Sequence, residues 1–149
     1  MKYINAYAGT GTDVIYEKEN GDCDLWIGGT RAWRNNNPGN IRAGDFALRR
    51  AAIGAAGGFA VFPNYETGFA ALIALLRAPS YQQLTVEQAI NRYAPPIEND
   101  TGAYINAVEK QIGISRNAPM KLLSDDGLYK LAKAIEKHEG YKAGIIKSA

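Results

Sequence analysis

The chain contains a single cysteine and a single histidine among its 149 residues. Cys23 has no partner within the chain, so an internal disulfide is excluded and the fold cannot depend on an oxidising compartment. With His138 as the one histidine, neither a zinc site nor a Cys–His nucleophile can be assembled. We therefore predict no metal and no cofactor, and any acid–base chemistry must come from Asp and Glu.

Long hydrophobic runs and a strong charge of one sign are also lacking. No apolar run approaches the length of a membrane span, and 17 Lys and Arg residues against 15 Asp and Glu residues give a net charge of +2. Proteins that bind nucleic acid usually carry a denser basic patch. The opening stretch, MKYINAYAGTGTD, lacks the apolar core and the cleavage site of a secretory signal. We expect synthesis in the cytoplasm without a signal peptide, and neither a nucleic-acid nor a membrane partner.

Hydrophobic residues make up 46% of the chain, which is enough to build one core. We predict a single domain over residues 1–149. Within it, residues 14–27 place two β-favouring runs around Asn20 and Gly21, a pair typical of a tight hairpin turn. We expect a hairpin in a variable region, 1–27, ahead of a core at 28–149.

Four helices are predicted from apolar spacing and from capping residues. Thr85 and Gln88 have the form of a capping box, and Asp100 or Thr101 can cap the next helix, which Gly113 ends in the left-handed conformation. The expected helices start near residues 64, 85, 101 and 124. The predicted fold class is therefore mainly α (α+β), a helical domain with a small N-terminal β-hairpin.

The last predicted helix carries the main chemical signal. Its apolar stripe consists of Leu128, Leu131, Ala132 and Ile135, and the next position on the same face is Glu139. Burial penalises the ionised carboxylate, so the pKa of Glu139 should rise and the side chain could act as a general acid. Gly140 follows and can end the helix. The alternative is a glutamate that reaches solvent at a frayed helix end.

Two polar segments could line a cleft. The first, residues 93–104, contains Glu98, Asp100 and Thr101, for which helix capping or plain solvation is the alternative. The second, residues 31–43, is rich in Asn, Gly and Pro and is predicted to be an ordered loop. Three of its asparagines offer amide groups, and its tryptophan offers a ring, although the asparagines could bond their own turn and the ring could lie in the core. These four residues are Asn36, Asn37, Asn40 and Trp33.

Four blocks of sequence together resemble a group of phage structural and lysis-associated proteins assigned to the lysozyme-like superfamily. In chain order they are WRNNNPGNIRAGDFA, GGFAVFPNYETGFAALIALL, RYAPPIENDTGAYINAV and AIEKHEG. The similarity covers roughly residues 28–141. It implies a lysozyme-like domain that acts on bacterial peptidoglycan.

The order of the blocks differs from that of related wall-cleaving enzymes. In lytic transglycosylases and glucosaminidases a glutamate at a helix end precedes the Asn-rich type of loop, and a Tyr-Ala or Tyr-Asn motif follows. Here NNNPGNIR resembles the loop and Tyr93-Ala94 resembles the tyrosine motif, but the helix that ends in Glu139-Gly140 comes last. We infer a circular permutation, with the opening helix at the end of the chain. Glu17 and Glu19 precede the loop but are interpreted as a solvated strand face.

The resemblance implies a role for each candidate residue. Glu139 would protonate the glycosidic oxygen between N-acetylmuramic acid and N-acetylglucosamine. If water is the nucleophile, Glu98 or Asp100 would orient it or stabilise the cation; if a muramyl hydroxyl closes the ring, one acid–base residue is enough. The predicted substrate-binding residues are Tyr93, Asn36, Asn37, Asn40, Thr101 and Trp33.

Two other functions remain open at this point. One is a non-catalytic wall-binding or virion structural module, and the other is an amidase or peptidase, which the shortage of metal and thiol ligands disfavours. We expect a monomer whose partner is peptidoglycan, with an immunity or inhibitor protein as a second partner to consider. Its delivery to the wall would need a lysis pore, a phage particle or a secretion machine.

Overall fold

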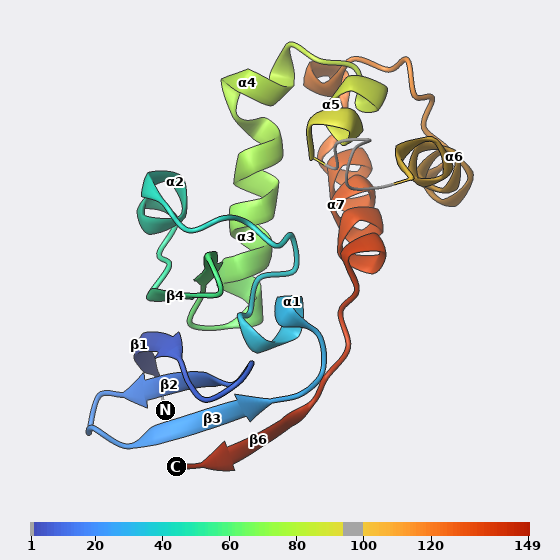
Figure 1. Ribbon diagram of the computed structural model, residues 1–149. Helices are drawn as coiled ribbons and strands as arrows, with labels where there is room; N and C mark the ends of the chain where they lie inside the picture. Colours follow the sequence, from blue (N-terminus) through green and yellow to red (C-terminus); the bar gives the residue numbers. More distant parts are fainter. Residues whose placement is uncertain (1, 94–99) are drawn as a thin grey trace. The chain divides into compact units, whose positions relative to one another are not determined.

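The computed structural model describes residues 2–93 and 100–149 (Figure 1). Glu98 lies outside these residues. The chain forms two compact units. Unit 1 consists of Met1–Leu72 and Glu139–Ala149, and unit 2 consists of Ile73–His138. Each unit is described by itself.

Unit 1 is built on a mixed sheet, and the described residues contribute six strands to it in the order β5-β4-β1-β2-β3-β6. The strands are β1 (Tyr3–Ala8), β2 (Val14–Lys18), β3 (Cys23–Ile27), β4 (Gly54–Ala56), β5 (Phe59–Val61) and β6 (Ile145–Ser148). β1 and β4 are parallel, and the other neighbours are antiparallel. β6 brings the end of the chain back to β3 (Figure 1).

The predicted fold class, mainly α with a small hairpin, is wrong, because the protein is an α+β structure with this larger sheet. The predicted hairpin exists as β2 and β3, and Gly21 in its turn has a φ of 89°. The missed strands have weak local signals. β4 and β5 have three residues each in a Gly-rich stretch, and β6 is exposed at every position, so it shows no alternation. β4 and β5 pair with each other across a short turn, and only the pairings of β4 with β1 and of β6 with β3 join segments that are distant in the sequence.

Aromatic rings form the core of unit 1 under the sheet. Trp26 lies between Tyr16 and Trp33, with ring centres 4.8 and 4.7 Å away. Trp33 belongs to α1 (Arg31–Arg34), a short helix inside the segment predicted to be a loop. A second short helix, α2 (Asp45–Arg49), follows.

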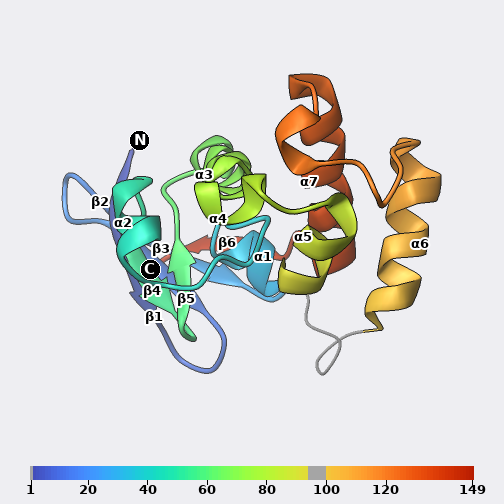
Figure 2. The same ribbon diagram turned by 90° about the horizontal axis from the view of Figure 1, so that it is seen from above.

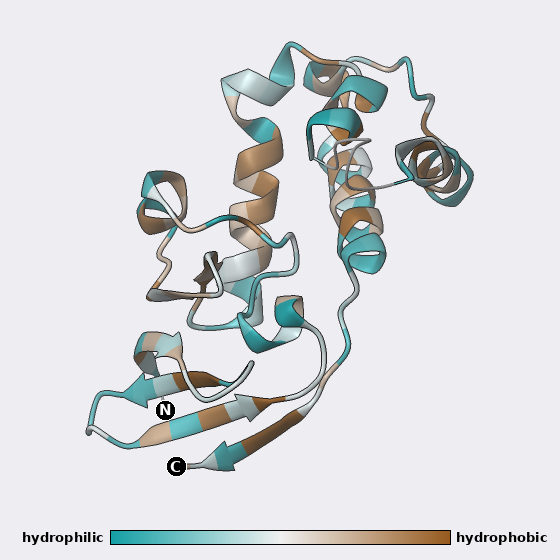
Figure 3. Ribbon diagram, in the orientation of Figure 1, coloured by the Kyte–Doolittle hydropathy of each residue, from teal (hydrophilic) through white to brown (hydrophobic). Residues whose placement is uncertain are grey.

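Helices make up unit 2. They are the C-terminal part of α3 (Tyr65–Arg77), α4 (Pro79–Gln82), α5 (Val86–Tyr93), α6 (Thr101–Ile112), the 3-10 helix η1 (Met120–Leu122) and α7 (Asp125–Glu139) up to His138. In Figure 2, α5, α6 and α7 are neighbours. The middle of α3 is apolar (Figure 3), with Leu72 and Leu76 fully buried. None of the helices in the described part of the chain has both the length and the apolar content that a membrane span requires.

The predicted helix boundaries in unit 2 are confirmed by their caps. The Thr85 amide donates to Gln88 at 3.0 Å, and the Gln88 amide donates to the Thr85 hydroxyl at 3.2 Å. Asp100 caps α6 by accepting from the Ala103 amide, and Gly113 ends it with a φ of 69°. Capping residues within one helical turn were therefore sufficient to predict where these helices begin and end.

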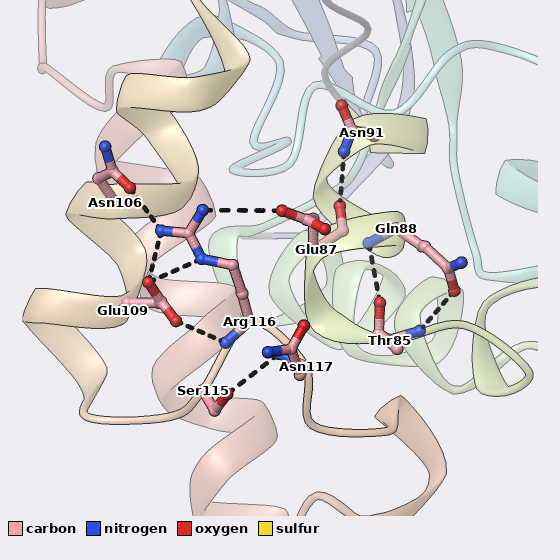
Figure 4. A network of polar contacts seen from close by, with 9 residues as sticks. All are labelled: Thr85, Glu87, Gln88, Asn91, Asn106, Glu109, Ser115, Arg116 and Asn117. Carbon is pink, nitrogen blue, oxygen red and sulfur yellow. Dashed lines mark hydrogen bonds and ion pairs between the residues drawn. The ribbon is translucent and has the colours of Figure 1, made fainter.

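Arg116 ties the segment after α6 to two helices (Figure 4). Its guanidinium donates twice to Glu109 of α6, at 2.6 and 2.9 Å, and lies 3.7 Å from Glu87 of α5. The Arg116 side chain and amide hold the pKa of Glu109 below its usual range by hydrogen bonding. This network is structural: it keeps α5 and α6 together.

Candidate active site

Glu139 is the last residue of α7, one turn beyond the fully buried Ile135. Gly140 follows with a φ of 85°, which ends the helix. The Glu139 side chain is half-buried. Burial raises its pKa, and the positive charge of Arg31 opposes this rise. A carboxyl group in these surroundings keeps a proton to a higher pH than a solvated glutamate does.

Thr30 fixes the chain just beyond Glu139. Its amide donates to the Lys142 carbonyl at 2.9 Å, and its hydroxyl accepts from the Lys142 amide at 3.0 Å. The same hydroxyl caps α1 by accepting from the Trp33 amide. One threonine therefore joins the segment after Glu139 to the start of α1, where Arg31 lies.

A hollow of about 510 Å³ lies in unit 1, with Tyr141 in its wall, two residues after Glu139. Tyr65 packs edge-on against Tyr141 at 5.3 Å between ring centres. Glu139 is not itself a lining residue of the hollow. The lining residues are Lys2, Tyr3, Trp26, Asn36, Pro63, Asn64, Tyr65 and Tyr141. Aromatic faces with a few amide groups suit a sugar ring that carries an N-acetyl group.

A buried carboxylate lies next to this hollow. Asp24 is 8% exposed, accepts a hydrogen bond from the Tyr3 hydroxyl at 2.6 Å and pairs with Lys18 at 3.3 Å. The Trp26 indole donates to the Tyr3 oxygen at 3.3 Å. Burial and the bond to Asp24 raise the pKa of Tyr3 to about 12, so Tyr3 stays neutral. Asp24 is therefore held in place by its partners.

The asparagines singled out in the sequence have different surroundings. Asn37 is completely buried, and its side chain bonds both the amide and the carbonyl of Ile41 and the carbonyl of Ala60, each at 2.9 Å. Asn36 lines the hollow while its amide donates to the Phe62 carbonyl at 3.3 Å. The buried Oδ1 of Asn40 has no hydrogen-bond partner among the described residues. Asn37 thus holds the loop, and Asn36, which is 3% exposed, is also engaged in an internal contact.

Trp33 is 8% exposed and packs against Trp26 in the core. It has little free surface for a sugar. Trp26 lines the hollow but is itself only 9% exposed, so the half-buried Tyr65 and Tyr141 offer more ring surface there.

Three candidates belong to unit 2. Tyr93 is the last residue of α5, Asp100 caps α6, and Thr101 is 4% exposed at the first position of α6. They belong to a different unit from Glu139 and the three asparagines.

Sequence reasoning missed Asp24, Tyr65, Tyr141 and Arg31. One signal was available: Asp24 and Trp26 alternate on one strand, so both point to the same face. The proximity of Arg31 to Glu139 had no local signal, because residues more than a hundred positions apart form the contact between Thr30 and Lys142.

No protein-family model and no curated protein sequence matches this chain.

Proposed function

We propose that the chain cleaves the glycan strands of peptidoglycan between N-acetylmuramic acid and N-acetylglucosamine, as a muramidase or a lytic transglycosylase. The observation that carries this proposal is the half-buried Glu139 with its raised pKa at the end of α7. The nearby hollow, with the half-buried rings of Tyr65 and Tyr141 and the exposed amide of Asn64, adds surfaces that suit an N-acetylated sugar.

In the proposed reaction Glu139 donates its proton to the glycosidic oxygen while the bond from that oxygen to the anomeric carbon breaks. The sugar develops oxocarbenium character, and the Glu139 carboxylate that remains lies near the charge of Arg31. Water or a muramyl hydroxyl then attacks the anomeric carbon and gives up a proton, which restores Glu139. A second carboxylate stays a prediction: Glu98 lies outside the described residues, and Asp100 caps α6 in unit 2.

A circular permutation relative to phage lysozymes is part of the proposal. Both chain ends lie in the sheet of unit 1, where Ser148 pairs with Asp24 and the Tyr3 hydroxyl reaches the same Asp24. The ends are therefore near each other (Figure 1), as a permuted chain requires.

The first test is digestion of purified sacculi by the wild-type protein, with mass spectrometry of the soluble products. We expect disaccharide-peptides with either reducing or anhydro muramic ends, and each end identifies one of the two reactions. Free stem peptides would instead show an amidase or peptidase. Binding to sacculi without any soluble product would support the wall-binding module.

A further inference from the structure

Two arginines of unit 1 are stacked on one aromatic ring. The guanidinium carbon of Arg31 lies 3.7 Å from the centre of the Phe59 ring, and that of Arg42 lies 4.6 Å from it. Phe59 is 8% exposed and belongs to β5, whose backbone pairs with β4. A buried ring on a paired strand is a rigid support, so the two guanidinium groups are neighbours with limited freedom.

Neither guanidinium forms an ion pair with a described residue; Glu139 senses Arg31 through its charge alone. All ion pairs found in that part of the chain involve other cations. Arg31 and Arg42 are both exposed, and the segment from residue 31 to residue 50 contains five arginines and one aspartate. Their positive charge is therefore oriented by Phe59 and presented to solvent.

We propose that Arg31 and Arg42 bind a carboxylate of the stem peptide on the muramoyl residue, so that the preferred substrate is glycan that carries its peptides. This inference rests on the proposed function. A guanidinium has a planar fork of N–H donors that matches a carboxylate with two parallel hydrogen bonds. In peptidoglycan, carboxylates occur on the stem peptides and, where a stem peptide is absent, on the lactyl group of the muramic acid itself.

Binding of a carboxylate to Arg31 would also affect the protonation of Glu139. Arg31 is the positive charge that opposes the raised pKa of Glu139. A substrate carboxylate bound to Arg31 would offset that charge, so Glu139 would hold its proton more firmly in the complex. Glycan whose carboxylates are blocked lacks this effect and would be cut more slowly.

The test compares three preparations of sacculi that contain no teichoic acid. The first is untreated, the second is stripped of stem peptides and then converted to methylamides at the exposed lactyl carboxylates, and the third keeps its peptides with their carboxylates converted to methylamides. For the wild type we expect initial cleavage of untreated sacculi to be about 10-fold faster than that of the other two, since charge-assisted hydrogen bonds are typically worth about that factor or more. In Arg42→Gln the ratio should fall to about one. Arg49→Gln, which removes an equal charge from α2 without touching Phe59, should keep the wild-type ratio.

Three results would overturn the inference. The first is a wild-type ratio of cleavage rates, untreated to treated sacculi, near one, and the second is an Arg42→Gln ratio equal to that of the wild type. The third is full activity on the methylamide sacculi, because the recognised group would then not be a carboxylate. Arg42→Gln is to be checked by its melting curve, and Arg31→Gln serves as a second variant if it does not fold.

Pull-down with the three preparations separates this inference from the proposed function. Arg42-dependent binding without cleavage by the wild type would leave the carboxylate site standing and remove the glycosidase. Cleavage at the same rate with or without the carboxylates and with or without Arg42 would support the glycosidase and remove the carboxylate site.

Discussion

Two effects act on the pKa of Glu139 in opposite directions. Burial at the end of α7 favours the protonated acid, and Arg31 favours the carboxylate. Burial is the larger effect, so the net direction is a raised pKa. That balance suits a group that must hold a proton near neutral pH and release it to a leaving oxygen.

This raised pKa predicts how Glu139→Gln changes stability with pH. The protonated acid stabilises the folded protein below the ordinary pKa of glutamate, and this contribution is lost as the pH rises through the raised folded-state pKa. Glutamine does not titrate, so its melting temperature relative to the parent should increase between pH 4 and pH 8. Scanning calorimetry across this range measures the difference.

Glu136→Gln is the matched control, since Glu136 lies on the same helix and is paired with Lys133 at 3.4 Å. It should show no such increase. A difference between Glu139→Gln and the parent that stays constant or shrinks with pH would mean that the carboxyl is not destabilised by burial.

Among single residues, Glu139 could be placed from the sequence, because it lies four positions after Ile135 and therefore on the same face of one helix. The sequence also left open the roles of Asn37 and Trp33, and the structure shows both at internal contacts. Arg31 could not be predicted, because its proximity to Glu139 arises from tertiary contacts through Thr30.

At the scale of elements, local signals were sufficient for α3, α5, α6, α7 and the β2–β3 hairpin. Each has a cap, a turn pair or an apolar period within its own residues. β1, β4, β5 and β6 were missed. β1 and β5 have neighbouring partners in the sequence, β2 and β4, but β4 and β5 are short and Gly-rich, and the pairings of β1 with β4 and of β6 with β3 join distant segments. The order of the sheet was therefore beyond sequence reasoning.

The start of α3 depends on a glycine for its contact with the Asn-rich loop. A Cβ atom at Gly68 would overlap the Asn36 carbonyl oxygen. We expect Gly68→Ala to lower the free energy of unfolding by about 3 kcal/mol or more, although alanine is the better helix former. Urea denaturation of the variant and the parent measures this.

Gly102→Ala in α6 provides the comparison. Among the described residues, a Cβ there meets only the Asp100 carboxylate, at 3.9 Å, so alanine should stabilise the protein by up to about 1 kcal/mol. Equal effects of the two substitutions would contradict the close packing of α3 on the Asn36 backbone.

At the scale of the whole molecule, both chain ends belong to the sheet of unit 1. β1 and β6 are separated by β2 and β3, so three strand spacings, about 14 Å, lie between them. Tyr3 and Ser148 are at the same end of the sheet, since both are linked to Asp24. A short linker can therefore join the ends.

This arrangement predicts that a circular permutant will fold. The permutant joins residues 149 and 2 with about six Gly and Ser residues, which can span roughly 20 Å, and opens the chain before Leu122, which is 72% exposed. Its chain then begins just ahead of α7, the order expected for phage lysozymes. Circular dichroism should show a cooperative melt within several degrees of a linear control that carries the same linker at its C-terminus. A permutant without a cooperative melt would contradict the proximity of the ends.

The proposed reaction depends most on Glu139 as the general acid, and the rate of glycan cleavage by Glu139→Gln tests this directly. Glutamine keeps the shape of the side chain but has no proton to donate, and general acid catalysis contributes about 100-fold to 10,000-fold. We predict that Glu139→Gln binds sacculi as the parent does but releases muropeptides at least about 100-fold more slowly, whereas Glu136→Gln cleaves at nearly the parental rate. Near-parental release of muropeptides by a folded Glu139→Gln would contradict the central role of this residue.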